Sequence, residues 1–276
     1  MKKINLNNKK LLTLIIVIIV LIILLQTYIK IINRYRNDRI FALESEKYAK
    51  EVSNPVFKIE KIMIYSDANV EDLSENKNLS NINVSQFTDF AIYIDNTVKT
   101  DELTAENTIN SIYIDNIGIT ANEEIGGTKK FSTKNLESLG KYVPITESSK
   151  EINYNVIHKN SDKELIDNTN SFYTDCSEPL VLSYVNENIV ENKDVSNTGE
   201  KLSLDGSMLK YLNVDLADLN YKINFSINIE NNLGENFTCN CSLNIDLNTG
   251  DGQGIYSGYI MQIFDLSNGD FRFKKV

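Results

Sequence analysis

The sequence predicts a mainly β protein, in which an N-terminal transmembrane helix and a short helical stalk precede an antiparallel β-sandwich-like domain with a few short helices. Two observations predict this fold class. The first is an almost unbroken apolar run near the N-terminus. The second is a series of segments in which apolar and polar residues alternate with a period of two, as in strands with one buried face. Setting aside the anchor and stalk leaves roughly 225 residues, enough for one large or two small β domains.

Residues 11–32 form the predicted transmembrane helix. Leu11–Leu25 reads LLTLIIVIIVLIILL, and the apolar stretch continues around Lys30 to Ile32. A helix of about 20 apolar residues spans the hydrocarbon core of a bilayer. The competing interpretation is a cleaved signal peptide, which needs small residues at its cleavage site. Residues 26–32 (QTYIKII) contain no such site, so we expect an uncleaved anchor in contact with the lipid bilayer.

Basic residues flank this helix on both sides. Four lysines lie in residues 1–10, and Lys30 and three arginines follow the apolar run. A short basic tail followed by one span usually inserts with the tail in the cytoplasm. We therefore expect a single-pass protein of the cell membrane, with residues 1–10 as a short cytoplasmic tail and the C-terminal domain outside the cytoplasm. Abundant Asn, Ile and Lys and the absence of Trp are typical of an AT-rich bacterial genome.

Residues 33–54 are predicted to form a juxtamembrane helical stalk that continues the transmembrane helix. The stretch lacks Gly and Pro and is rich in helix formers. We expect the helix to end at Ser53-Asn54, because Pro55 pushes the residue before it out of the α region. Residues 55–276 then form the mainly β part, either as one domain or as two subdomains divided near residues 186–206.

The charge of the chain is divided unevenly. Residues 1–40 hold eight of the 28 basic residues and one of the 38 acidic residues. The remainder therefore has 20 basic and 37 acidic residues, a net charge of −17. An acidic domain is repelled by nucleic acid and by anionic lipid headgroups. We therefore expect no nucleic-acid partner.

Segments with the character of β-strands follow Pro55. Tyr221–Ile229 alternates without a fault, Phe237–Leu247 repeats the pattern, and the six residues Glu230–Glu235 fit a hairpin loop. Phe57, Ile59, Ile62 and Ile64 share one face only if a β-bulge lies near Glu60-Lys61. The other predicted strands are residues 89–96, 109–120, 152–158, 180–185, 255–266 and 271–273. We expect the strands from residue 221 onward to form one C-terminal meander.

Short helices are predicted at Thr100–Thr108, Ser132–Leu139 and Ser207–Leu219. Residues 186–206 are polar and predict a long loop. The pentapeptide IYIDN occurs at both 92–96 and 112–116. We interpret the two copies as neighbouring strands of similar composition. The alternatives are an ancestral duplication and a helical crossover between parallel strands.

No catalytic constellation is visible. His158 is the only histidine, so a Ser-His-Asp or Cys-His arrangement would have to use it, and its place in the alternation predicts an exposed strand end. No second histidine is present to share a zinc ion. Asp246–Gly252 fails as a calcium loop, because its sixth position is Asp251 and its twelfth is Ser257. We predict no catalytic, cofactor-binding or metal-binding residue, and no cofactor.

The three cysteines allow two interpretations. Cys239 and Cys241 share the inward face of a predicted strand, where cysteine acts as a small apolar residue. The alternative is a disulfide between Cys176 and one of these two, which leaves one thiol free.

Tyr113–Ile117 reads YIDNI. This string resembles the closing strand of some jelly-roll carbohydrate-binding modules. The resemblance covers five residues and implies a glycan-binding module, in which an acid near this position helps to hold a structural calcium ion.

The leading functional expectation is non-enzymatic. We expect a membrane-anchored binding or scaffold protein of a bacterial cell envelope that contacts another envelope protein. The first alternative is a carbohydrate- or wall-binding β-sandwich module, and the second is a carboxylate-dependent hydrolase of the envelope. A flat apolar patch would favour a protein partner, exposed tyrosine rows a glycan, and a deep cleft lined by paired acids the hydrolase.

Overall fold

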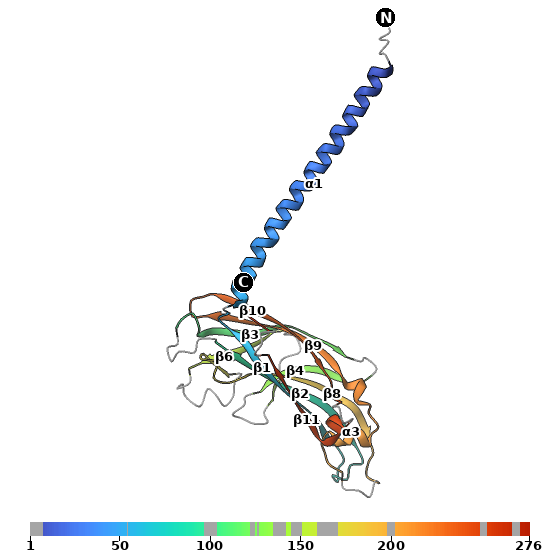
Figure 1. Cartoon of the computed structure of the whole chain (residues 1–276). Helices are drawn as coiled ribbons and strands as arrows, with labels where there is room; N and C mark the ends of the chain where they lie inside the picture. Colours follow the sequence, from blue (N-terminus) through green and yellow to red (C-terminus); the bar gives the residue numbers. More distant parts are fainter. Residues whose placement is uncertain are drawn as a thin grey trace, which may run out of the picture. The chain divides into compact units, whose positions relative to one another are not determined.

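In the computed structural model, helix α1 extends from Asn8 to Ser53 (Figure 1). It runs without a break through the predicted stalk and ends before Pro55, as the sequence predicts. Its segment Ile15–Leu43 is long and apolar enough to cross a membrane, a property that an N-terminal signal sequence shares. The chain divides into two compact units, Met1–Asn54 and Pro55–Val276. The structure describes residues 8–53, 55–96, 104–121, 125, 127–134, 142–144, 151–158, 171–197, 202–248, 253–266 and 271–276.

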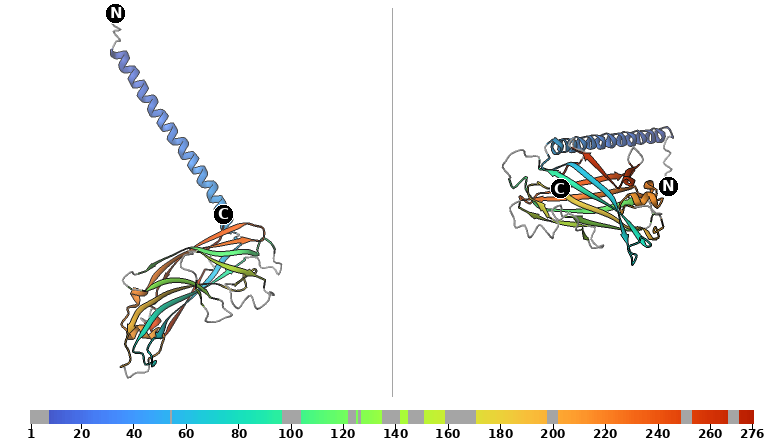
Figure 2. Two further views of the ribbon diagram at one scale, coloured as in Figure 1. Left: turned by 180° about the vertical axis from the view of Figure 1, so that it is seen from behind. Right: turned by 90° about the horizontal axis from the view of Figure 1, so that it is seen from below.

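The unit Pro55–Val276 contains two six-stranded sheets, so the prediction of a mainly β chain is confirmed (Figures 1 and 2). The first sheet is antiparallel throughout, and in the second only β6 and β7 pair in parallel. The first sheet has the order β11 (Tyr259–Asp265), β1 (Lys58–Asp72), β2 (Ile82–Asp95), β8 (Leu180–Lys193), β4 (Thr128–Lys134), β5 (Tyr142–Pro144). The second has the order β12 (Lys274–Lys275), β10 (Asn236–Ile245), β9 (Tyr221–Asn231), β3 (Ile109–Ala121), β6 (Ile152–Ile157), β7 (Ser171–Tyr173).

Buried side chains from both sheets form one hydrophobic core. The ring of Phe57, just before β1, packs edge-on against that of Phe237 in β10, with 5.4 Å between centroids. The ring centroid of Tyr184 in β8 lies 4.6 Å from that of Tyr221 in β9. These aromatic contacts join one sheet to the other, and such pairs add stability beyond the area that they bury.

Several details of the strands follow the predicted pattern. The register between β1 and β2 shifts between Ile59 and Lys61, which confirms the predicted bulge. As a result, the four apolar residues on either side of the bulge all lie fully buried. The alternation of β9 and β10 is also confirmed, with their inward apolar residues buried. The two strands pair antiparallel through the predicted hairpin.

The prediction of a single C-terminal meander is wrong. The chain leaves β10 and makes a short 3-10 helix, η1 (Gly254–Ser257). Strand β11 then pairs with β1 in the first sheet rather than with β10. Gly254 has φ +47°, and a Cβ there would lie 1.9 Å from the carbonyl oxygen of Leu247, so this crossing requires glycine. The last strand is Lys274–Lys275 rather than 271–273.

The prediction of a long loop at residues 186–206 is also wrong for residues 186–193. Strand β8 continues to Lys193 despite its polar sequence. Asn188 and Asn192 adopt positive φ angles, and their backbone N–H groups donate to side chains of β2, to Ser85 Oγ and Asn83 Oδ1, both at 3.0 Å. Side chains of β2 thus accept hydrogen bonds from the backbone of this part of β8. Its sequence has no apolar alternation from which the strand could be predicted.

The predicted helices are only partly observed. Ser207–Leu219 forms two short helices, α3 (Ser207–Tyr211) and α4 (Leu216–Leu219). Residues 132–134 belong to β4, which corrects the start of the predicted helix Ser132–Leu139, and residues 135–139 lie outside the described residues. Residues 105–107 form a turn, and the first part of the predicted helix 100–108 also lies outside the described residues.

The two IYIDN copies are not neighbouring strands. Residues 92–95 lie in β2 of the first sheet, whereas 112–116 lie in β3 of the second. No parallel crossover joins them, because they belong to different sheets. In each copy the isoleucines point into the core, so the repeated pattern reflects the same demand for a strand with one buried face.

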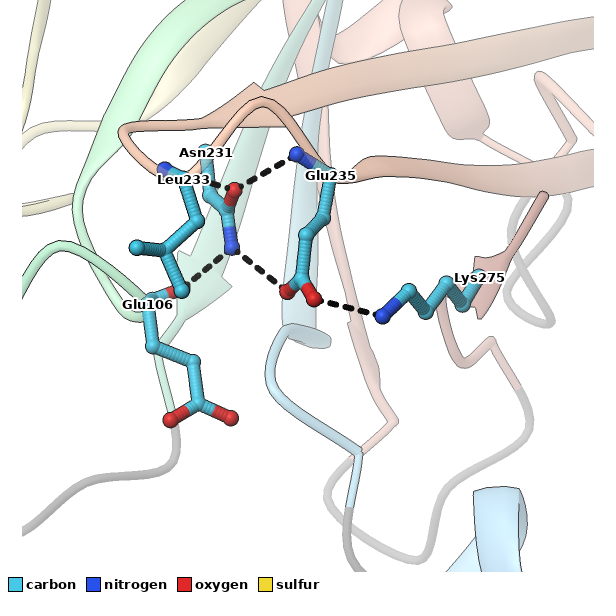
Figure 3. A network of polar contacts seen from close by, with 5 residues as sticks. All are labelled: Glu106, Asn231, Leu233, Glu235 and Lys275. Carbon is cyan, nitrogen blue, oxygen red and sulfur yellow. Dashed lines mark hydrogen bonds and ion pairs between the residues drawn. The ribbon is translucent and has the colours of Figure 1, made fainter.

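The loop between β9 and β10 is held by the buried amide of Asn231 (Figure 3). Its Oδ1 accepts hydrogen bonds from the backbone N–H groups of Leu233 and Glu235, at 3.0 and 2.9 Å. Its Nδ2 donates to the carbonyl oxygen of Glu106 and to the Glu235 carboxylate, both at 3.0 Å. Glu235 also pairs with Lys275 of β12 at 2.5 Å. Asn231 therefore connects the hairpin to the segment that holds Glu106, and Glu235 connects it to β12.

Candidate interaction face

The outer faces of the two sheets differ in chemistry. On the second sheet, the outward side chains of β9 and β10 are almost all asparagine, serine, threonine or charged. On the first sheet, the outward side chains near β11 are mostly apolar. An apolar region on the surface of a folded domain is a feature that usually has a function.

Strand β11 carries the most exposed part of this region. Tyr259, Met261 and Ile263 are 57%, 58% and 62% exposed, whereas Ile260 and Leu266 are buried. The sequence YIMQIF therefore places large apolar side chains on both faces of one strand. The outward residues stand opposite Asp67, Tyr65 and Met63 of β1, respectively.

Aromatic rings continue this surface across three strands. The ring centroid of Tyr65 on β1 lies 5.3 Å from that of Tyr259 on β11 and 6.3 Å from that of Phe87 on β2. Both ring pairs are tilted rather than perpendicular, with 40° and 31° between their planes. We call the half-buried and exposed residues of this region the apolar face: Met63, Tyr65, Phe87, Tyr259, Met261 and Ile263.

Carboxylates interrupt the apolar face and are held in place. The Tyr65 hydroxyl donates to Asp67 Oδ2 at 3.1 Å, and the backbone N–H of Gly206 donates to Asp67 Oδ1 at 3.2 Å. Asp89 accepts a 2.5 Å hydrogen bond from Ser183 Oγ. Burial, and then the charge of Asp67, raise the pKa of Tyr65 to about 12. The tyrosine therefore stays a neutral hydrogen-bond donor at physiological pH.

The acids Asp67 and Asp205 lie close enough to influence each other. Burial raises the pKa of Asp67, and the charge of Asp205 contributes a smaller part of the rise. Asp205 Oδ1 accepts hydrogen bonds from the backbone N–H and hydroxyl of Ser207, at 2.9 and 2.6 Å. Backbone donors thus bind both carboxylates, which fastens the start of α3 to β1.

The segment that resembles a carbohydrate-binding module lies in the middle of the second sheet. Asp115 Oδ1 accepts hydrogen bonds from Asn228 Nδ2 and Asn116 Nδ2, at 2.9 and 3.0 Å. A β-bulge follows between Asp115 and Gly118. Ser226 donates to Asn240 and Thr238 donates to Asn228, at 2.8 and 2.7 Å. Amides and hydroxyls of three strands therefore form a continuous polar network on this outer face.

The other sites considered from the sequence are His158 and the loop that begins at Asp246. His158 follows β6 and is exposed, as predicted, and its Nδ1 lies 3.4 Å from Thr174 Oγ1. Asp246 accepts the backbone N–H of Asn248 in a turn, and residues 249–252 lie outside the described residues. Within the described part of the chain, no three His, Cys, Asp or Glu residues gather as metal ligands.

All three cysteines are free in the structure, which does not contain the alternative disulfide. Cys239 and Cys241 are buried on the inward face of β10, as expected from their spacing. Burial raises the pKa of the Cys176 thiol to about 12, with a further contribution from the charge of Asp175. A thiol with such a pKa is protonated at neutral pH and is a poor nucleophile.

Comparison of the chain with protein-family models, with curated proteins and with solved structures found no match. Function is therefore inferred from the chemistry of the site itself. The sequence predicts a strand at 255–266, whereas the apolar face was not predicted. One signal for this face is present in the sequence: YIMQIF carries apolar residues at both odd and even positions. A strand with one face in solvent needs apolar residues only at alternate positions.

Proposed function

We propose that this chain is a membrane-anchored binding or scaffold protein of a bacterial cell envelope, and that its domain lies outside the cytoplasm and contacts another envelope protein through the apolar face. The observation that supports this proposal is the exposure of Tyr259, Met261 and Ile263 beside the Tyr65 ring. Aromatic residues and methionine are enriched at protein interfaces. Methionine is also common on surfaces that adapt to their partners.

The architecture is consistent with this role. We infer that the two sheets form a β-sandwich, because side chains from both contribute to one core. We also infer that α1 is an uncleaved transmembrane anchor, since its apolar segment is long enough to span a bilayer. An anchor of this kind would tether the domain to the membrane that holds other envelope proteins.

Site-specific photo-crosslinking in intact cells tests the proposed function. A photoreactive amino acid replaces Met63 in the apolar face, opposite Ile263 of β11, and a matched variant carries it at Asn244 on the polar face of β10. The proposal predicts a discrete adduct with another envelope protein from position 63 and none from position 244. The absence of adducts at 63, or the same adducts at both positions, would contradict it.

A second candidate function is supported by the polar network of the second sheet. The half-buried Tyr113 lies beside Asp115 and Asn228 in this network. An aromatic ring beside several amide and carboxylate groups can stack on a sugar and bind its hydroxyls. Binding of the full chain to a glycan array, lost in Tyr113→Ala and retained in Met63→Ala, would favour this candidate over a protein partner. No binding to any glycan would reject it.

A further inference from the structure

The strands at the ends of the two sheets are not equally protected. An unpaired strand edge can pair with another chain, and proteins usually guard it with short strands, lysine or proline. Three of the terminal strands fit this pattern: β5 has three residues and ends in Pro144, β7 has three residues, and β12 is the two-residue Lys274–Lys275. Strand β11 has seven residues, YIMQIFD, without lysine or proline.

The hydrogen bonds of β11 show which residues face its open edge. In the described part of the chain, β11 pairs only with β1. The backbone N–H of Leu266 donates to the carbonyl oxygen of Glu60 at 2.8 Å, so Leu266 faces β1. Backbone groups alternate in direction along an antiparallel strand. Those of Tyr259, Met261 and Ile263 therefore point away from β1, and the same three residues carry the exposed apolar side chains.

We propose that β11 pairs antiparallel with β11 of a second copy of this chain, centred on Met261, so that the first sheet continues from one molecule into the other. The side chains select this register. With Met261 at the centre, Met261 faces its own counterpart and each Tyr259 faces an Ile263. Shifting the centre to residue 260 places Ile263 opposite Ser257, and shifting it to residue 262 places Tyr259 opposite Asp265.

The central register favours a second copy as the occupant of the edge. An aromatic side chain opposite a β-branched one is a favourable cross-strand pair. The exposed Asp265 faces Ser257 rather than another acid, so no like charges meet within the paired strands. Copies confined to one membrane by their helices also meet at a raised effective concentration. This inference goes beyond the proposed function, because it uses the edge of β11 and leaves the apolar face of each copy open to another protein.

Cysteine crosslinking of the full chain in cell membranes tests the pairing. At the centre of the proposed register, two copies of residue 261 form a hydrogen-bonded pair with Cα atoms about 5.5 Å apart, within the range of a disulfide. Met261→Cys should therefore shift the chain from monomer to dimer on mild oxidation. Tyr259→Cys and Ile263→Cys should crosslink to each other when coexpressed, and neither should crosslink when expressed alone.

Two controls accompany this experiment. Asp265→Cys lies on the same exposed strand but is far from its counterpart in the proposed register, so it should stay monomeric. The unsubstituted chain, whose thiols are those of Cys176 and the buried Cys239 and Cys241, should also stay monomeric. Absence of a dimer from Met261→Cys, or crosslinks of that residue to a different protein instead, would overturn the self-pairing. Photo-adducts from Met63 would then show whether the proposed function stands independently.

Discussion

The ring of Tyr259 lies 5.3 Å from the ring of Tyr65, so the outer edge strand β11 is joined to β1 by an aromatic contact as well as by the backbone ladder. Tyr65 in turn donates a hydrogen bond to Asp67. The apolar face is therefore built on ordered side chains of a continuous sheet. A surface that is ordered before binding loses less conformational entropy when a partner docks.

A charge placed on the apolar face should remove binding without unfolding the domain. Ile263→Lys replaces a side chain that is 62% exposed, so its free energy of unfolding should stay within about 0.5 kcal/mol of the parent. Photo-adducts from Met63 and the dimer of Met261→Cys should both be lost. The matched variant Asn244→Lys, on the second sheet, should retain both. Loss of binding in both variants would mean that added charge alone is responsible.

The Asn231 amide should be a main source of stability for the β9–β10 hairpin. Asn231→Ala removes four hydrogen bonds and leaves two backbone N–H groups without their acceptor. We expect a loss of about 2–3 kcal/mol in the free energy of unfolding, measured by urea denaturation of the full chain. Asn244→Ala, at an exposed position of β10, should change it by less than about 0.5 kcal/mol. Equal effects of the two substitutions would contradict this assignment.

Phe57 should be the aromatic side chain whose loss most weakens the contact between the sheets. It is fully buried and packs edge-on against Phe237 and Phe273. Phe57→Ala should cost about 3–5 kcal/mol, because it combines lost burial with a cavity. Leu233→Ala, at a hairpin side chain that is 59% exposed, should leave thermal unfolding almost unchanged. A small effect of Phe57→Ala would contradict a shared core.

Acid should weaken the contact between the hairpin and β12. The hydrogen bond from Lys275, and then that from Asn231, lower the pKa of Glu235. Because the folded-state pKa lies below the unfolded one, the stabilisation is complete above the unfolded pKa and is lost as pH falls through the folded one. Glu235→Gln should flatten this part of the stability–pH curve, followed by thermal unfolding between pH 3 and 6. Glu178→Gln, on an exposed turn, should leave the curve unchanged.

The thiols should be unreactive until the domain unfolds. Burial holds the pKa of Cys176 at about 12, and a hydrogen bond with Cys239 and burial also raise the pKa of Cys241. A thiol reagent at neutral pH should label the folded chain slowly and should detect three thiols after denaturation without a reductant. Detection of one thiol would instead support the disulfide between Cys176 and a cysteine of β10.

The sequence predicts this fold well where one face of an element is uniformly apolar. Residues 221–229 and 237–247 alternate cleanly, so their pairing as a hairpin with one buried face could be foreseen. The bulge at Glu60 follows from a single break in the phase of the isoleucines. Helix α1 ends before Pro55 for a local steric reason. In each case neighbouring residues determine the structure.

The remaining features depend on contacts that are distant in the sequence. Strand β8 continues past Val185 because side chains of β2 accept its backbone N–H groups. Strand β11 joins the first sheet because Ile255 and Leu266 are buried at its two ends, which no periodicity reveals. The segment YIMQIF shows apolar residues at both odd and even positions, but the sequence does not say which of them are exposed. An apolar residue can be identified as exposed only when the structure of the sheet is known, because the sheet determines which side of the strand faces outward.

The most direct test of the proposed function is whether the domain lies outside the cytoplasm. Leu233→Cys introduces an exposed thiol in the β9–β10 hairpin, remote in sequence from β11. Intact cells, with the wall removed where necessary, are treated with a membrane-impermeant maleimide before or after lysis, with the unsubstituted chain as background. If the domain lies outside the cytoplasm, as proposed, Leu233→Cys is labelled without lysis. Labelling only after lysis would place the domain in the cytoplasm and contradict the proposed envelope function.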